Sequence, residues 1–377
     1  GDRPAVLVDQ TAGATHRVRL LTTDARGRTR VARTYASPAQ PFGGHLWATS
    51  RGDLVAAWSD HPRGSGRRVV VATGLSLQRR QVLATDVEDV RGLDLAVNAR
   101  GDALAVFVRR AGDARTLAVS YRPTGGAFGP VQTVGPIDDL SPRAMIDANG
   151  VAAAAFNGPG GLFIADRPAG ATASFGAPSL VAQGSWLRPA GVLKDGRAVL
   201  AWISTADGSL GRLVIAERPA AGQPFSAPAL VGGGRPILYA SSLAVDGART
   251  LVAWNQSPGG ADPAGETVFA AATGSTWRPA VTTGGPTTND RDVELLGAGV
   301  MRPGMEVIVS SLKPGRSSVL QTATVRRDGT LAPRSTVATG LAGIPDVAAA
   351  QGTHHTWVAF TRLVRGVNRV QLRGSAG

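Results

Sequence analysis

The sequence predicts an all-β chain of short antiparallel strands, and three observations support this. A glycine turn followed by a short apolar run that ends in an aromatic residue recurs along the 377 residues. No segment keeps a helical period over ten residues, whereas runs rich in Val, Leu and Ala are bounded by Gly, Asp, Asn or Pro. Glycine and proline, at 49 and 24 residues, provide many turns.

The repeat has a period of about 50 residues. Its apolar runs end at Trp58, Phe107, Phe156, Trp202, Trp254, the degraded copy at Val309, and Phe360. A partial copy, Ala5–Asp9, opens the chain. We expect the six aromatic residues to occupy equivalent, buried positions near the end of the second strand of each repeat.

Each repeat divides into four strand-like segments, A to D. In the second full copy they are Leu93–Asn98, Ala103–Val108, Thr116–Tyr121 and Pro130–Val134. The A–B turns contain Arg-Gly, Asn-Gly or Asp-Gly, and the last two tolerate the positive φ that tight hairpins require.

A second motif predicts strand D. It pairs Arg-Pro with a later Phe and Pro, as in Arg122-Pro123 with Phe128-Gly129-Pro130. Similar pairs begin at Arg167 and Arg218. Proline cannot donate a ladder hydrogen bond, so it indicates an edge strand. The aromatic residue would then fill the gap between neighbouring sheets.

Four-stranded antiparallel units at this period predict a β-propeller, with residues 1–377 forming one domain. The copy at the N-terminus contains only strands B, C and D, and the copy at the C-terminus contains only strands A, B and C. We favour seven blades, closed by Arg30–Tyr35 pairing with the strand around Arg369–Leu372. Two separate three-stranded end blades would give eight, and this alternative stays open.

The repeat resembles those of exported bacterial β-propellers, a class loosely similar to sialidase-like propellers. The residues that carry the resemblance are the Ala-Val-Asp-x-x-Gly…Ala-x-Trp pattern and the Arg-Pro-Ala-Gly…Phe-x-x-Pro pattern. The resemblance implies the fold, and a secreted or cell-envelope location with the signal peptide absent from this chain. No intact Asp box, Ser/Thr-x-Asp-x-Gly-x-x-Trp/Phe, is present.

Composition and charge narrow the function. There is no cysteine, which excludes disulfides and cysteine-ligated metal sites, and no apolar stretch is long enough to span a membrane. The net charge is +13, and only Lys194 and Lys313 among 40 basic residues are lysines. These arginines are scattered rather than clustered, so we expect an anionic surface or polymer as partner, not a nucleic acid. We expect a monomer with no metal and no cofactor.

Functional residues of a propeller gather where the D–A and B–C connections converge. Arginines there could hold a carboxylate or phosphate bidentately, and aromatic side chains could pack on sugar rings. The candidate ligand-binding residues are Trp47, Arg91, Arg143, Trp186, Arg188, Arg235, Tyr239 and Arg291. The arginines do not share one distance from the A–B glycine.

We therefore predict a non-catalytic binding propeller that recognises an anionic glycan, a cell-envelope polymer or a protein partner at one face. The alternative is a glycan-processing hydrolase or lyase of sialidase-like architecture. The chain has only three tyrosines and five glutamates. Tyr239 is the one tyrosine in a D–A connection and Glu266 lies in a B–C connection, so these two form the only plausible catalytic pair. No catalytic residue is assigned.

Overall fold

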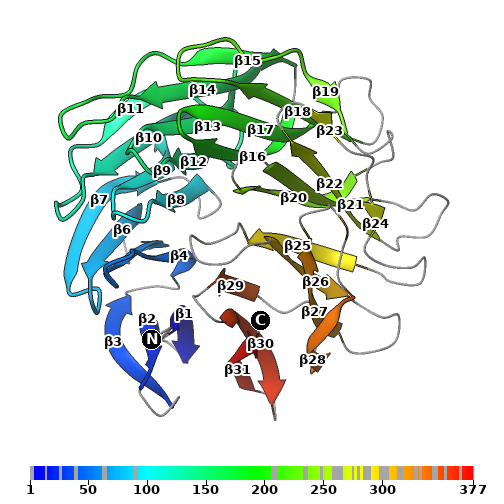
Figure 1. Ribbon diagram of the computed structural model, residues 1–377. Helices are drawn as coiled ribbons and strands as arrows, with labels where there is room; N and C mark the ends of the chain where they lie inside the picture. The colour runs from blue at the N-terminus through cyan, green and yellow to red at the C-terminus, as the bar shows by residue number, and fades with distance from the viewer. Residues whose placement is uncertain are drawn as a thin grey trace. The chain divides into compact units, whose positions relative to one another are not determined.

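A computed structural model gives the fold (Figure 1). The described residues are 4–12, 15–24, 28–37, 41–61, 66–87, 92–184, 186–204, 211–231, 237–246, 249–256, 266–273, 276–277, 281–282, 290–296, 305–311, 318–326, 330, 333–341, 347–351, 355–364 and 367–376. The chain divides into two compact units. One unit holds Ala5–Leu200 and Ala216–Ala227, and the other holds Gly1–Pro4, Ala201–Ile215 and Pro228–Gly377. The single domain over residues 1–377 stays a prediction.

The regular elements of the described chain are β-strands, which pair in antiparallel sheets in sequence order. The sheets up to residue 136 are β1 (Ala5–Ala12), β2 (Thr15–Thr23) and β3 (Thr29–Ser37); β4 (Phe42–Ala48), β5 (Leu54–Asp60), β6 (Arg67–Gly74) and β7 (Arg79–Val87); and β8 (Leu93–Val97), β9 (Ala103–Ala111), β10 (Ala114–Arg122) and β11 (Gln132–Pro136). A single bridge between Val87 and Arg109 joins the second and third of these sheets.

The same four-strand pattern continues along the chain. The next sheets are β12 (Arg143–Ile146), β13 (Ala152–Gly158), β14 (Gly161–Arg167) and β15 (Ser179–Gln183); β16 (Trp186–Lys194), β17 (Arg197–Ser204), β18 (Arg212–Arg218) and β19 (Ala229–Leu230); and β20 (Ile237–Asp246), β21 (Arg249–Gln256), β22 (Glu266–Thr273), β23 (Thr276–Trp277) and β24 (Val281–Thr282). The last are β25 (Asp290–Leu296), β26 (Met305–Ser311), β27 (Ser318–Val325) and β28 (Ser335–Leu341); and β29 (Val347–Gln351), β30 (His355–Val364) and β31 (Val367–Ala376). Successive four-stranded antiparallel sheets confirm the predicted β-propeller class, and each such sheet is called a blade below.

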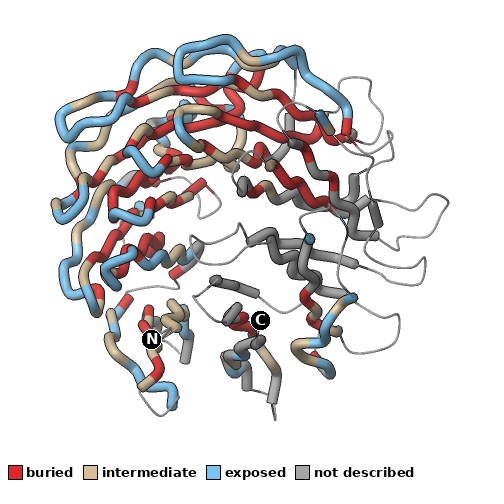
Figure 2. Tube along the Cα trace, viewed as in Figure 1, coloured by how far each residue is buried: buried red, intermediate tan, exposed pale blue. Residues whose placement is uncertain are grey.

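The predicted aromatic repeat is confirmed. Each of the six aromatic residues at the end of strand B is at most 2% exposed: Trp58, Phe107, Phe156, Trp202, Trp254 and Phe360. Phe107 packs in a cluster formed by the β4–β7 and β8–β11 blades, and Phe156 packs in one formed by the β8–β11 and β12–β15 blades. The middle strands are buried and many of the turns are exposed (Figure 2). The core therefore lies between stacked blades.

The A–B turns take their shape from one side chain and one glycine. The Asn98 Oδ1 accepts the backbone N–H groups of Gly101 and Asp102 at 3.0 Å each, and Gly101 has φ of 100°. The Asn98 Nδ2 also donates to the Asp147 carbonyl, in the equivalent turn of the next blade, at 2.9 Å. An Asn-x-x-Gly variant of the repeated Asp-x-x-Gly pattern thus builds this turn and links it to its neighbour.

The aromatic residue of the strand D motif has the predicted role in two of three copies; Phe225 in the third is half-buried, and the prolines lie just before strand D rather than in it. Phe128 and Phe175 are buried, each within a cluster shared by two blades. Each Arg that precedes the proline is buried too: Arg122, Arg167 and Arg218. Arg122 and Arg167 donate to carbonyls of the turn between strands C and D, whereas Arg218 pairs with the Asp166 carboxylate.

The number of blades depends on how the two end sheets are completed, and it stays a prediction. Arg30–Tyr35 lies in β3, which pairs with β2, and Arg369–Leu372 lies in β31, which pairs with β30. The predicted closing pair would join the two units and stays a prediction, as does the choice between seven and eight blades.

Candidate functional site

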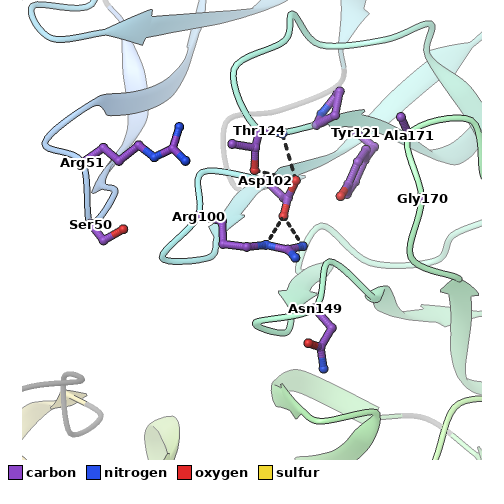
Figure 3. A pocket seen from close by; sticks show the side chains of 10 residues that line it. Ser50, Arg51, Arg100, Asp102, Tyr121, Thr124, Asn149, Gly170 and Ala171 are labelled. Atoms are coloured by element: carbon purple, nitrogen blue, oxygen red, sulfur yellow. Dashed lines mark hydrogen bonds and ion pairs between the residues drawn. The ribbon is translucent and has the colours of Figure 1, made fainter.

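A pocket of about 570 Å³ opens where three blades bring their A–B and C–D turns together (Figure 3). It lies within the unit that contains Ala5–Leu200. Its lining residues come from the end of β10 and from the turns that follow β4, β8, β10, β12 and β14: Ser50, Arg51, Arg100, Asp102, Tyr121, Pro123, Thr124, Asn149, Gly170 and Ala171. The volume falls in the range of small-molecule sites.

The Asp102 carboxylate is the fixed centre of the pocket. Its Oδ2 accepts the Asn98 Nδ2 at 2.9 Å and the Arg100 Nε and Nη2 at 3.1 and 2.7 Å. Its Oδ1 accepts the Thr124 N–H and hydroxyl at 2.8 and 2.9 Å. Burial alone would raise the pKa of Asp102, but the hydrogen bonds from Asn98, Arg100 and Thr124 outweigh it and lower the pKa to about 2. Asp102 is therefore ionised at neutral pH.

Two buried guanidinium groups lie behind the pocket wall. The Arg122 Nε and Nη1 donate to the carbonyls of Gly126 and Gly101, at 2.9 and 2.5 Å. The Arg167 Nη1 and Nη2 donate to the carbonyls of Pro168 and Gly170, at 3.1 and 2.5 Å. Burial lowers the pKa of both side chains. Because these groups are used by main-chain oxygens, they shape the turns and add positive potential without reaching a ligand.

Tyr121 forms part of the wall between these groups. The Arg167 guanidinium carbon lies 3.3 Å from the centre of the Tyr121 ring, so one ring face is already covered. Gly150, in the facing turn, has φ of 84°, and a Cβ there would lie 2.8 Å from Arg100 Nη2 and 3.1 Å from Tyr121 Oη. Only glycine lets the turn approach this closely, which fixes the floor of the pocket.

Three polar groups remain available to a ligand. Among the described residues, the exposed Arg51 forms no hydrogen bond or ion pair, and it extends from its turn toward the side chains of the neighbouring blade (Figure 3). The Nη1 of the half-exposed Arg100 and the side-chain amide of the exposed Asn149 also have no partner in the described part of the chain. Pro123 and Ala171 contribute apolar surface beside them. The arrangement suits an anion with neighbouring hydroxyl groups.

The pocket has one carboxylate, and glycoside hydrolysis with the usual pair of acids needs two, roughly 5 to 10 Å apart. Asp102 is the only Asp or Glu among the lining residues. With a pKa of about 2 it has no proton to donate at neutral pH, and five hydrogen bonds occupy its oxygens. The Asp102 carboxylate is thus poorly suited to proton transfer at neutral pH. Among the described residues, no three His, Asp or Glu side chains gather to hold a metal ion.

A second polar cluster runs along the first strands of three blades. His45, Asp94 and Arg143 each pair with the residue just before the strand B aromatic residue of their own blade. Asp94 Oδ1 lies 3.7 Å from His45 Nδ1, and Asp94 Oδ2 lies 3.8 Å from Arg143 Nη1. The Arg143 Nε donates to the Pro189 carbonyl at 2.8 Å. This inner-strand row links three consecutive blades and, through Pro189, the strand β16 that follows them.

Of the eight predicted ligand-binding residues, two have described side chains. Trp47, in β4, is 45% exposed, and Arg143, in β12, belongs to the inner-strand row. Four others have described backbone only: Trp186 and Arg188 in β16, Tyr239 in β20 and Arg291 in β25. Arg91, Arg235 and the side chains of those four lie outside the described residues, as does the side chain of Glu266. The structure therefore leaves this predicted site untested.

The sequence patterns alone do not predict the pocket, because its residues come from the other ends of the strands. In the sequence, Arg100 and Asn149 are simply turn residues before a glycine, and Arg122-Pro123 is the start of an edge-strand motif. The available signal is that both motifs fall at the same ends of neighbouring strands. Combined, they place arginines from three blades around one opening.

Comparison with known proteins supports the fold alone. No protein-family model and no curated protein sequence matches the chain significantly. Among solved structures, an ulvan lyase of polysaccharide lyase family PL25 is similar over 91% of this chain and 96% of its own, at 12% identity and a TM-score of 0.55; a second structure of it, bound to -[GlcA(1-4)Rha3S]-, gives 0.52. The GH93 α-L-arabinofuranosidase of Fusarium graminearum covers 89% of this chain and 93% of its own, at 11% identity and a TM-score of 0.46. The Aleuria aurantia lectin covers 80% and 96%, at 12% identity and 0.44.

Proposed function

We propose that this protein is a non-catalytic binding propeller that holds an anionic glycan in the pocket around Asp102. The observation that carries the proposal is the unpaired Arg51 on a pocket wall backed by two buried arginines. Two exposed guanidinium groups line the pocket and two buried ones lie behind its wall, whereas Asp102 is the only acidic lining residue, which gives the pocket a positive potential. One similar structure, the ulvan lyase, was solved with -[GlcA(1-4)Rha3S]- bound. A cell-envelope polymer of this chemistry, met by an exported protein, would be the natural partner.

The alternative is a glycan-processing hydrolase or lyase. The feature that favours it is the inner-strand row, where a histidine, a carboxylate and an arginine lie together. Against it, the His45 Nε2 already lies 3.1 Å from the Leu93 carbonyl and its Nδ1 faces Asp94, so both ring nitrogens have protein partners. Binding is the better-supported function. We keep Trp47 and Arg143 as a second candidate contact on the first strands, together with the other predicted residues.

A pair of tyrosine substitutions tests the binding site. Ala171→Tyr places a bulky side chain in the pocket wall, and Ala114→Tyr places the same group on the exposed first residue of β10. β10 runs from Ala114 to Arg122, so the control position lies at the far end of the strand from Pro123. Affinity electrophoresis through gels with polygalacturonate, a sulfated galactan or neutral galactan measures binding. We expect retardation by an acidic polymer that Ala171→Tyr weakens and Ala114→Tyr leaves unchanged.

The same samples separate binding from catalysis. After prolonged incubation we expect neither new reducing ends nor unsaturated sugars. Release of either product, abolished by His45→Ala, would overturn the non-catalytic proposal in favour of the alternative. Equal migration in acidic and neutral gels would remove the anionic glycan altogether.

A further inference from the structure

The pocket presents two exposed arginines, but only one has its charge available. The Arg100 Nε and Nη2 both donate to Asp102 Oδ2, and that carboxylate stays ionised because its pKa is about 2. The positive charge of Arg100 is therefore neutralised at contact distance. Arg51 has no acidic partner among the described residues. A ligand meets one uncompensated guanidinium.

A second acidic group would find no equal partner. It would have to take Arg100 from Asp102, which would leave a nearly buried carboxylate with fewer donors, at a large cost. The arginines behind the wall, Arg122 and Arg167, donate to main-chain carbonyls and are at most 4% exposed. Their positive electrostatic potential favours an anion in the pocket, but they donate no hydrogen bond to it.

The other free groups suit uncharged sugar hydroxyls. The Arg100 Nη1 can donate, and the Asn149 amide can both donate and accept. Pro123 offers an apolar surface on the same wall, whereas one face of the Tyr121 ring is covered by Arg167. A ring would therefore pack against Pro123.

We infer that the sugar unit held in the pocket carries a single acidic group, a carboxylate or a sulfate ester, which pairs with Arg51, while Asn149 and Arg100 hydrogen-bond its hydroxyls. This inference rests on the proposed function and specifies its ligand. It also assigns unequal roles to the two exposed arginines. Arg51 forms the ion pair with the acidic group of the sugar, whereas Arg100 holds Asp102 and the turn in place and offers only its Nη1 to a hydroxyl.

The test uses three hexasaccharide probes with the full-length protein. They are a galacturonate oligomer, the same oligomer with its carboxyl groups methyl-esterified, and a sulfated galactan oligomer with one sulfate per residue. The ester has the shape of the first probe without its charge, and the third separates carboxylate from sulfate. Isothermal titration at 20 and 200 mM NaCl measures affinity for the wild type, Arg51→Gln and Arg110→Gln. Arg110 is an exposed control that pairs with Asp113 at the far ends of the strands.

We expect at least one acidic probe to bind, and the ester to bind at least about tenfold more weakly. Arg51→Gln should cause a similar loss for the acidic probe and no loss for the ester, while Arg110→Gln should change neither. The added salt should weaken only the acidic probe. Whichever acidic probe binds more tightly identifies the acid group.

Two kinds of failure are distinguishable. If neither acidic probe binds, both the proposed function and this inference are wrong. If an acidic probe binds but Arg51→Gln behaves like Arg110→Gln, or the ester binds equally well, the glycan function stands and the single-charge inference is wrong. A far-ultraviolet circular dichroism spectrum and melting temperature equal to those of the wild type show that each variant is folded.

Discussion

The Arg167 guanidinium covers the ring of Tyr121 from the neighbouring blade, with its central carbon 3.3 Å from the ring centre. Arg167 ends β14 and Tyr121 lies near the end of β10, so this contact joins the C–D turns of two blades beneath the pocket. Burial raises the pKa of the Tyr121 hydroxyl, which favours its neutral form beside Asp102. Stability and pocket shape therefore depend on the same contact.

Arg167→Ala should lower the free energy of unfolding by about 3 kcal/mol. It removes a desolvated cation–π contact and two hydrogen bonds to the turn carbonyls. Arg167→Lys should keep the charge but lose the planar group, at about half that cost. Urea unfolding followed by tryptophan fluorescence measures both. Arg110→Ala, at an exposed arginine, is the control, and equal midpoints for it and Arg167→Ala would contradict the expected role.

The sequence could predict the core because the core follows the repeat. A residue fixed at one place in each copy falls at one depth in each blade, and every aromatic residue from Trp58 to Phe360 that ends strand B is buried. The turn pattern could be predicted for the same reason, since the main-chain N–H and carbonyl of Asn98 and of Asp147 bond the residues four and three positions later in the same way. Residues that recur at the same position of the sequence repeat therefore pack at the same depth in the structure.

The pocket could not be predicted in the same way, because it depends on how the copies differ. Arg100 is placed by Asp102 and Gly150, and neither pairing follows from the shared pattern. The inner-strand row shows a signal that was available. His45, Asp94 and Arg143 each lie 13 residues before the strand B aromatic residue and 7 before the A–B glycine, but a comparison of arginines alone misses that register because the three residue types differ.

Trp58→Ala and Trp47→Ala form a matched pair: both remove a tryptophan side chain, but only Trp58 is buried, so the difference in stability measures the effect of burial. Trp58 is 2% exposed and its ring centre lies 5.2 Å from that of Tyr35. Its truncation should cost about 3–5 kcal/mol through lost transfer free energy and a residual cavity. Trp47 is 45% exposed, and its truncation should cost under about 1 kcal/mol. Calorimetric melting temperatures of the two variants in one buffer give the comparison, and similar losses would refute the assigned repeat positions.

Asp102 should make stability fall in acid. Its pKa is lowered from 3.8 to about 2 in the folded chain, so the unfolded state binds the proton first as the pH drops. The contribution, about 2 kcal/mol, is complete above pH 4 and is lost as the pH falls through 2. Urea midpoints between pH 2 and 7 measure it.

Asp102→Asn should flatten this acid limb and lower stability at pH 7 by about 2–4 kcal/mol, because an amide cannot accept all five hydrogen bonds. Asp113→Asn, at a fully exposed aspartate, is the control. If the difference between the Asp102→Asn and Asp113→Asn curves does not change with pH, the ionised Asp102 is not the cause of the acid limb.

Two glutamines on outer strands provide a graded test of the contacts between blades. The Gln132 side chain, in β11, donates to the Phe175 carbonyl at 2.8 Å and accepts the Phe175 N–H at 2.9 Å. Gln81, in β7, makes one such bond, from Nε2 to the Phe128 carbonyl at 3.0 Å. Both bonded phenylalanines are buried, so their backbone groups have no easy replacement in water.

Gln132→Ala should therefore cost about 2–3 kcal/mol and Gln81→Ala about 1 kcal/mol. Gln132→Glu should fall between them, because a carboxylate still accepts the Phe175 N–H but cannot donate to the carbonyl. Thermal unfolding measured by calorimetry orders the three variants. Equal losses for Gln132→Ala and Gln81→Ala would mean that the second hydrogen bond between Gln132 and Phe175 adds nothing beyond the apolar packing of Phe175. The stability of the blade interface would then depend on the aromatic residues alone.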